Sequence, residues 1–255
     1  MKAYLVSLRF HWGYSIRNYF TSKATDSYIL PPLNTVIGAL AMANSARNGI
    51  HVENRFDKSG RKYSSAKDYV DRVKYASFNF QYKPIKFTSM LRYSSAIYWF
   101  TTHDIQTNKK ISDLFAPIQF GLASYLNGII NMFLVTDLNK ADLYSITRLG
   151  SKESIVSAVM VKEVKGKKVE KDKEVPNVTF SFSKNLTKSI VGNFFVELVP
   201  SLNPLYYDFF FPSTAKTTNL DVIYVPNPVV KIVTNEEECV FESEQGNIIT
   251  PGDVC

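Results

Sequence analysis

The segments that decide the fold read FHWGYSIR at residues 10–17 and YILPPLNTVIGAL at residues 28–40. Before the first segment, Ala3–Phe10 has the β-branched and aromatic content and the partial alternation of a strand. Gly13 can relax the backbone where that strand ends. In the second segment, Pro31 and Pro32 suit the first turn of a helix, where backbone donors lack intrahelical partners. The sequence therefore predicts a strand, an aromatic and basic loop, and a helix, in that order.

The predicted helix has one apolar stripe and recognisable ends. Apolar residues recur in it at spacings of three and four, which is typical of a helix that packs one face against a sheet. They are Leu33, Val36, Ile37, Leu40 and Ala43. Asn34 or Thr35 is a candidate cap, and Asn48-Gly49 is expected to stop the helix.

The remaining elements predict an α+β protein. We expect an exposed loop at His51–Lys67, strands at Tyr75–Gln81 and Met90–Thr101, and a second helix at Ile118–Phe133. This order of elements matches the ferredoxin-like plan of RNA recognition modules. We therefore predict a ferredoxin-like (RRM-like) domain at residues 1–145 and a smaller, antiparallel β-sheet domain at residues 146–255.

The second domain is expected to be rich in strands. Ile155–Val164 and Val175–Phe182 flank a predicted hairpin tip at Lys165–Lys168, whose mixed charges favour a solvated surface over a nucleic-acid contact. Further strand-like stretches are interrupted by prolines. They are residues 193–199, 206–211, 222–225 and 229–233.

Composition narrows the class without naming a function. The longest apolar runs, such as Ile129–Val135, are too short to span a bilayer, and no charged-then-apolar leader precedes the first strand, so we expect a cytoplasmic protein without a membrane partner. The two cysteines, Cys239 and Cys255, have no metal-ligand spacing, and we expect both to be incidental.

Charge is divided unevenly between the two halves of the chain. Residues 1–125 hold 17 Lys and Arg against 7 Asp and Glu, whereas residues 126–255 hold 13 against 16. In the basic half, cations alternate with aromatic residues, as in a groove for single-stranded nucleic acid, where cations neutralise phosphates and rings stack on unpaired bases. In the alternative interpretation, aromatics such as Phe78, Phe80 and Trp99 build a core.

Two sequence patches resemble one protein family. The pattern Tyr28, Pro31, Pro32, Thr35, Gly38 and Leu40 resembles the amino terminus of the RAMP proteins of CRISPR systems, specifically the Cas family numbered five. The patch ITRLGSKES at residues 146–154 is similar to the segment that begins the second half of those proteins, and His11-Trp12-Gly13 points to the archaeal type I-A form.

The resemblance implies a fold, a role and partners. It implies the ferredoxin-like domain with a projecting thumb hairpin, which we place by position at residues 82–115. It implies a non-catalytic subunit of a Cascade interference complex that binds the 5′ handle of crRNA and caps the backbone filament. The implied partners are crRNA, a Cas family seven backbone subunit and the large subunit, with target DNA as a further candidate.

The candidate RNA-binding residues come from three regions. Those around the first helix are Tyr14, Arg17, Lys23, Tyr28, Asn34 and Thr35. Those in or near the thumb are Lys83, Lys86, Arg92, His103, Lys109 and Lys110. Those in the second patch are Arg148, Ser151 and Lys152. Asn34 and Thr35 are equally candidates for simple helix caps.

Two other functions are kept as alternatives, an endoribonuclease that processes precursor crRNA and a generic RRM-like RNA-binding protein. Cleavage requires a base and an acid, supplied by His or a perturbed Lys. In the cleaving relatives, a Tyr lies in the first helix and a Lys directly precedes a His. In this chain, residues 33–48 contain no Tyr. The residues directly before the three histidines are Phe10, Ile50 and Thr102, and none of them is a Lys. We therefore predict no catalytic residue, metal or cofactor, and His103 beside Asp104 is the best position for an independent nuclease.

Overall fold

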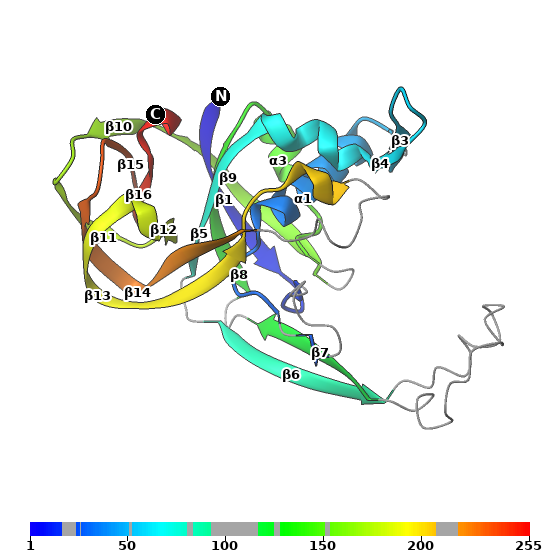
Figure 1. The fold of residues 1–255 in the computed structure, drawn as a ribbon, viewed down its shortest axis with the longest axis horizontal. Helices are drawn as coiled ribbons and strands as arrows, with labels where there is room; N and C mark the ends of the chain where they lie inside the picture. The colour runs from blue at the N-terminus through cyan, green and yellow to red at the C-terminus, as the bar shows by residue number, and fades with distance from the viewer. Residues whose placement is uncertain are drawn as a thin grey trace.

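A computed structural model describes residues 1–16, 24–25, 27–50, 53–80, 84–92, 117–124, 128–150, 154–207 and 219–255. Mixed α and β structure, most of it sheet, makes up these residues (Figure 1). In the described part of the chain, no helix is both long and apolar enough to cross a bilayer.

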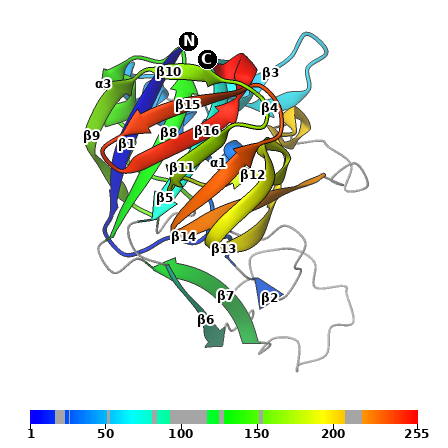
Figure 2. The same ribbon diagram turned by 90° about the vertical axis from the view of Figure 1, so that its left-hand side faces the viewer.

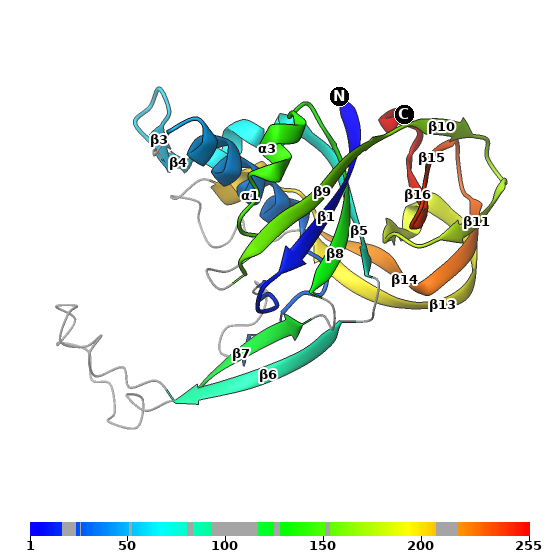
Figure 3. The same ribbon diagram turned by 180° about the vertical axis from the view of Figure 1, so that it is seen from behind.

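A four-stranded antiparallel sheet organises the amino-terminal part. Its strands are β1 (Lys2–Phe10), β5 (Val73–Phe80), β8 (Ile129–Thr136) and β9 (Val156–Val164), in the order β5-β8-β1-β9. The helices α1 (Leu33–Arg47) and α3 (Lys140–Tyr144) lie on one side of this sheet, and the carboxy-terminal strands lie on the other (Figures 1 and 3). Along the chain these elements follow the order strand, helix, strand, strand, helix, strand.

A seven-stranded sheet makes up most of the carboxy-terminal part (Figure 2). Its strands are β10 (Gly166–Val169), β11 (Glu174–Val178), β12 (Phe182–Ser183), β13 (Thr187–Pro200), β14 (Leu220–Thr234), β15 (Glu238–Ser243) and β16 (Gly246–Pro251). The order is β10-β15-β16-β11-β14-β12, and β13 pairs with β14. The second sheet is thus confirmed, but it has more strands than the first, and its β11–β16 pair is parallel.

Smaller elements complete the described structure. A three-stranded sheet contains β2 (Ala24–Thr25), β6 (Ile85–Arg92) and β7 (Pro117–Ser124), and a two-stranded sheet contains β3 (Asn54–Phe56) and β4 (Lys62–Ser64). The 3-10 helices are η1 (Ser65–Arg72), η3 (Lys184–Leu186), η4 (Pro204–Tyr207) and η6 (Gly252–Val254). The stretch predicted as one loop at His51–Lys67 therefore contains β3, β4 and the start of η1.

The first sheet is buried on both faces. Tyr4, Val6 and Leu8 of β1 join the core beneath α1, whereas Ala3 and Leu5 join a core shared with the second sheet. Successive side chains of a strand point to opposite faces, so one strand serves both cores. The shared core contains rings from both sheets, among them Phe133 and Phe241, whose centroids lie 4.7 Å apart.

The predicted first helix is confirmed, but its predicted cap is not. α1 begins at Leu33 after Pro32, which occupies the N-cap position without a side-chain cap bond. Neither Asn34 nor Thr35 caps it, because both already lie inside the first turn. The helix ends at Asn48, followed by Gly49 with a φ of 66°, as the sequence predicts.

The predicted second helix at Ile118–Phe133 is wrong. Residues 117–124 form β7 and residues 129–136 form β8, while α3 follows at Lys140–Tyr144. β8 lies between β1 and β5 and is buried over almost its whole length. A short apolar run that is buried on both faces has no alternation to distinguish a strand from a helix.

The predicted hairpin at Lys165–Lys168 is also wrong. β9 pairs with β1 in the first sheet, whereas β10 pairs with β15 in the second, so the chain crosses between sheets at Lys165. The expected domain division after residue 145 therefore does not coincide with the division between the sheets.

The segment predicted as a thumb contains one strand of a projecting pair. β6 and β7 pair in antiparallel register from Ile85 opposite Ser124 to Arg92 opposite Pro117, and they extend away from the two main sheets (Figures 1 and 3). Residues 93–116 lie outside the described residues, so the thumb stays a prediction.

The two cysteines form a disulfide and are not incidental. Cys239 and Cys255 are bonded, with 5.5 Å between their Cα atoms. Cys239 is fully buried in β15 within the core shared by the two sheets. The bond therefore fastens the segment after β16 to that core.

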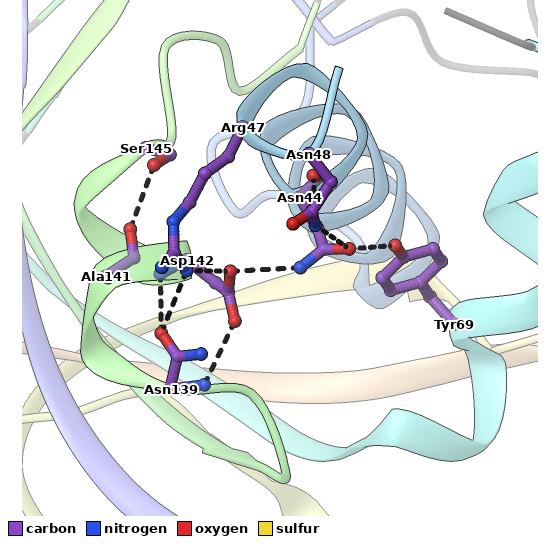
Figure 4. Close-up of polar contacts among 8 residues, drawn as sticks. All are labelled: Asn44, Arg47, Asn48, Tyr69, Asn139, Ala141, Asp142 and Ser145. Carbon is purple, nitrogen blue, oxygen red and sulfur yellow. Dashed lines mark hydrogen bonds and ion pairs between the residues drawn. The ribbon is translucent and has the colours of Figure 1, made fainter. Parts of the chain in front are cut away.

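A buried carboxylate joins α1 to α3 (Figure 4). Asp142 accepts hydrogen bonds from Asn44 Nδ2 at 2.9 Å and from Arg47 Nη1 at 2.6 Å, and it forms a capping box with Asn139. Asn44 Oδ1 also accepts from the Tyr69 hydroxyl at 2.5 Å, which adds η1 to the network. These bonds fix the carboxy-terminal end of α1.

We predict that Asp142→Ala lowers the free energy of unfolding by about 2–3 kcal/mol, because it leaves partly buried donors of Asn44 and Arg47 without their acceptor. Asp137→Ala is the matched control, since it breaks the exposed Arg72–Asp137 pair and should cost less than about 1 kcal/mol. Urea unfolding followed by circular dichroism measures both. Equal losses for the two variants would contradict the assignment of Asp142 as a structural anchor.

Glu238 is a buried acid between the sheets. Burial raises its pKa to about 7, and the nearby negative charge of Glu236 contributes to the same shift. Burial, together with the charge of Glu238, raises the pKa of Tyr75, whose hydroxyl donates to the Ile249 carbonyl at 3.3 Å. Below about pH 7, the neutral form of Glu238 is therefore favoured in the folded protein.

An acid with a raised pKa binds its proton more tightly in the folded state, so its contribution to stability is lost as the pH rises. The unchanged chain should lose free energy of unfolding as the pH rises from 4.5 to 7. We predict that Glu238→Gln makes this loss smaller by about 1–2 kcal/mol. Glu244→Gln is the control, because the hydrogen bond from Lys162 lowers the pKa of Glu244. The contribution of Glu244 to stability is therefore lost only as the pH falls below about 4.5, outside the range compared. Urea unfolding across this pH range provides the comparison.

Candidate nucleic-acid interface

A cavity of about 730 Å³ lies along the outer face of α1. One wall contains Ser15 and Ile16, and a second contains Ser64 and the start of η1. A third wall contains Arg148 and Gly150. Segments that are far apart in the sequence thus meet around one helix face.

The helix turns its small and polar side chains toward this cavity. Val36, Ile37 and Leu40 are buried against the sheet, whereas Thr35 and Gly38 line the cavity from the other side of the helix. A Cβ added at Gly38 would have no described neighbour within 4 Å. The lack of a side chain therefore leaves this part of the cavity open to a ligand.

Gly150 allows two loops to approach closely. Its φ is 122°, and an added Cβ would lie 2.8 Å from Ser154 Oγ and 2.9 Å from the Ser15 carbonyl oxygen. The buried Ser154 hydroxyl also accepts a hydrogen bond from the Ser15 N–H at 3.0 Å. The loop after β1 and the patch at residues 146–154 are therefore in direct contact.

The two glycines should respond oppositely to the same substitution. We predict that Gly150→Ala lowers the free energy of unfolding by about 2 kcal/mol or more, because the backbone conformation is strained for alanine and the contacts are too close. Gly38→Ala should leave stability unchanged or raise it by about 0.5–1 kcal/mol, because alanine favours a helix interior. Urea unfolding of both variants measures the difference, and a loss of stability in Gly38→Ala would contradict the open cavity.

Two predicted RNA-contacting rings lie in the core. Tyr14 is 1% exposed and Tyr28 is 4% exposed. The Tyr14 ring lies 5.1 Å from the ring of Phe10, and the Tyr28 N–H donates to the Ile16 carbonyl. The expectation that these rings face RNA is corrected, because in this structure their faces are covered and shape the loop before α1.

Three other predicted residues lie at or near the cavity. Thr35 and Arg148 both line it and are half-buried, so the structure brings them together as a hydroxyl and a cation. Asn34 is buried, and its side-chain amide has no hydrogen-bond partner among the described residues. Its backbone carbonyl accepts from the Tyr207 hydroxyl at 3.2 Å.

The other candidates are not brought to this cavity by the described structure. Lys86 is exposed on β6, and Arg92 ends that strand. The rest lie outside the described residues, and their roles stay predictions. They are Arg17, Lys23, Lys83, His103, Lys109, Lys110, Ser151 and Lys152.

Glu197 is a positioning residue that the sequence did not reveal. From β13 of the second sheet, its carboxylate accepts hydrogen bonds from the N–H groups of Ile29 at 2.7 Å and Leu30 at 2.9 Å. These bonds hold the turn that leads into α1. Local sequence gave no signal for it, because the partners are 167 and 168 residues apart.

Trp12 is a second feature that the sequence analysis left without a role. Its side chain is 81% exposed, directly before Gly13 with a φ of 94°. The sequence signal that could have identified Trp12 is an aromatic residue next to a glycine at the end of a strand.

Lysines of the carboxy-terminal part are engaged with acids. Lys162 contacts Glu244 at 2.6 Å and Lys168 contacts Glu237 at 2.8 Å, while Lys167 pairs with Glu242. The hydrogen bond from Lys168 to Glu237 raises the pKa of that lysine. The charges of Lys162 in β9 and of Lys167 and Lys168 in β10 are therefore balanced by acids between residues 237 and 244.

The described residues show no gathering of three His, Cys, Asp or Glu side chains that would hold a metal ion. Of the three histidines, His11 is described, and its Nε2 lies 2.9 Å from Ser157 Oγ. His11 does not line the cavity. His51 and His103 lie outside the described residues.

The fold is similar to one of known structure. The chain is similar to a CRISPR protein from Archaeoglobus fulgidus of known crystal structure, with a TM-score of 0.56, 22% identity, and coverage of 98% of this chain and 99% of the other. The chain thus has the fold of a CRISPR protein. No family model matches the sequence.

Sequence comparison gives the family. The chain is 31% identical over 169 residues to CRISPR-associated protein Cas5 3 of Saccharolobus solfataricus, covering 64% of this chain and 66% of the relative. It is 29% identical over 169 residues to the CRISPR system aCascade subunit Cas5 1 of the same organism, with the same coverage. The matches span about two thirds of the length of these relatives. The chain belongs to the Cas5 family, which excludes the generic RRM-like alternative.

Proposed function

We propose that this chain is a non-catalytic subunit of a type I CRISPR interference complex, in which it binds the 5′ handle of crRNA and caps the backbone filament. The single observation that carries the proposal is the cavity along α1, where both family-like patches meet around an open helix face. The proposed partners are crRNA, a Cas family seven backbone subunit and the large subunit, with target DNA as a further candidate.

The topology supports a module for RNA. The first sheet has the strand order β5-β8-β1-β9, with α1 and α3 as the intervening helices. We infer that it is a ferredoxin-like domain, because this connectivity matches the split βαβ plan. RNA-binding modules use this plan to present unpaired nucleotides with a sheet or loop surface.

The chemistry of the cavity suits a bent RNA backbone. Arg148 supplies a cation with several donors for phosphate oxygens, and Thr35 supplies a hydroxyl. Gly38 lets a sugar or phosphate approach the helix backbone closely. These groups recognise shape and charge, and Glu53 also lines the cavity.

The cavity can be tested with a gel-shift assay using end-labelled RNA that carries the repeat-derived 5′ handle, and a scrambled RNA for comparison. We predict that Arg148→Ala weakens handle binding by about tenfold, because it removes a charge-assisted contact. It should also reduce the dependence of the dissociation constant on salt by about one phosphate contact. Lys162→Ala is the matched control, because it removes an equal charge that pairs with Glu244 and does not line the cavity.

A second variant separates binding from folding. Gly38→Gln places bulk in the open part of the cavity, and we expect it to weaken binding by about tenfold while the unfolding transition is unchanged. Handle binding that is unaffected by both variants would refute the cavity as the site. New RNA ends in the same assay would refute the non-catalytic role and favour the endoribonuclease alternative.

A further inference from the structure

The cavity along α1 has a second end to which the proposed function gives no role. α1 contains 15 residues, so it is about 22 Å long. Thr35 lies in its first turn, whereas Met42 lies in its second half and Ile50 follows its last residue. Glu53 lines the same part of the cavity, directly before β3. We refer to Met42, Ile50 and Glu53 as the acidic end of the cavity.

The backbone around the acidic end is held by hydrogen bonds. The Glu53 carbonyl oxygen accepts from the Ser65 N–H at 2.9 Å, directly after β4. β3 and β4 lie beyond the carboxy-terminal end of α1 (Figures 1 and 3). The Ile50 N–H donates to the Ser45 carbonyl oxygen at 2.8 Å, which folds the chain back against the helix. Glu53 is therefore attached to two short elements that flank the cavity.

The carboxylate of Glu53 has no ion-pair or hydrogen-bond partner among the described residues. Arg55, two positions along the chain, is engaged elsewhere, with its Nη1 3.0 Å from Asp68 Oδ2. Within the described structure, no ion pair joins Glu53 to Arg148, which lines the same cavity. One ligand can therefore meet both charges.

An acid is unfavourable in a cavity for RNA unless it contacts a base. A carboxylate repels phosphate groups, so an acid that contacts no base would weaken the binding of every RNA. The same carboxylate has two acceptor oxygens and no donor. It favours binding where a base presents donors to it.

Among the RNA bases, guanine matches such an acceptor. Its N1–H and its N2 amino group are adjacent donors on the Watson–Crick edge, which is accessible in single-stranded RNA. On the same edge of adenine, cytosine and uracil, an acceptor lies next to each donor. A carboxylate that accepts both guanine bonds forms a bidentate, charge-assisted contact, which is stronger than hydrogen bonds between neutral groups.

The apolar side chains beside Glu53 provide a surface for the base ring. Met42 is 44% exposed and Ile50 is 42% exposed, although both line a cavity. Ser45 and Ala46, which also line it, are small and leave room for a ring. Covering the apolar area with a planar base removes it from water, which favours binding.

We propose that the acidic end of the cavity binds a guanine base of the RNA, with the Glu53 carboxylate accepting hydrogen bonds from the guanine N1–H and N2 amino groups. Met42 and Ile50 lie against the ring. This proposal rests on the proposed function, because it assigns a base to the RNA whose backbone Arg148 and Thr35 contact. It makes Glu53 the residue that gives the cavity its base specificity.

The test measures gel shifts of end-labelled handle RNAs in which each position in turn carries guanine, inosine, adenine, cytosine or uracil. Inosine differs from guanosine only in lacking the N2 amino group. At one position, we expect guanine to bind the unchanged chain about tenfold more tightly than inosine or any other base, because a good bidentate contact discriminates by about that factor. No preference for guanine at any position would overturn the proposal.

Glu53→Gln tests the carboxylate, because the amide presents a donor where guanine requires a second acceptor. The preference for guanine should fall to about twofold or less, and the guanine RNA should bind about tenfold more weakly. Asp71→Asn is the matched control, because it removes the same charge from an exposed residue of η1 that does not line the cavity. This control should keep the preference.

The outcomes separate this proposal from the proposed function. A Glu53→Gln chain that keeps the preference, or that binds every RNA at least as tightly as the unchanged chain, would overturn the base contact and leave the RNA role standing. Absence of handle binding by the unchanged chain would overturn the proposed function, and this proposal with it.

A photoreactive 6-thioguanosine at the preferred position locates the base on the unchanged chain, without relying on a variant that must fold. We expect crosslinks to Met42, Ile50 or Glu53, identified by mass spectrometry of the crosslinked peptide. Crosslinks confined to other parts of the chain would overturn the proposal.

Discussion

The burial of the first sheet on both faces is the constraint on which the rest of the structure depends. β1 lies between β8 and β9 and supplies alternate side chains to two cores, one beneath α1 and one shared with the second sheet. A strand in that position cannot shift register by one residue without moving its whole apolar set to the wrong face. The positions of α1 and of the second sheet are therefore fixed by the same nine residues, Lys2–Phe10.

That constraint places the cavity. With Val36, Ile37 and Leu40 held against the sheet, the opposite side of α1 must face outward. The chain leaves β1 through Ser15 and Ile16 and enters β9 after Gly150 and Ser154, so the two loops meet beside the same helix. Glu197 adds a contact from the second sheet to the entry of α1. The cavity is thus a product of the packing of both sheets, although its lining residues come from the amino-terminal elements and the loop before β9.

Local signals explain which parts of the fold were predictable. β1 and α1 were predicted with nearly correct ends, because proline, glycine and apolar spacing act within a few residues. The run at Ile118–Phe133 was misassigned, because a fully buried strand lacks the alternation that would identify it. The β1–β9 pairing, the Cys239–Cys255 bond and the role of Glu197 depend on residues distant in sequence, and one sequence carries no local signal for them.

The candidate site shows the same division. Arg148 and Thr35 were predicted from motifs, and the structure places both at one cavity. Tyr14 and Tyr28 were predicted to contact RNA because aromatic residues near cations suit unpaired bases, but the same rings also suit a core, and here burial decides for the core. An aromatic residue in a motif therefore identifies the segment more reliably than the role of its ring.

The described surfaces also differ in chemistry in a way that the whole-chain charge of +7 conceals. Lys168 of the second sheet pairs with Glu237, and Lys162 of β9 pairs with Glu244. Arg148 lies at the cavity together with Glu53, so a ligand that approaches α1 there meets one charge of each sign among small and apolar residues.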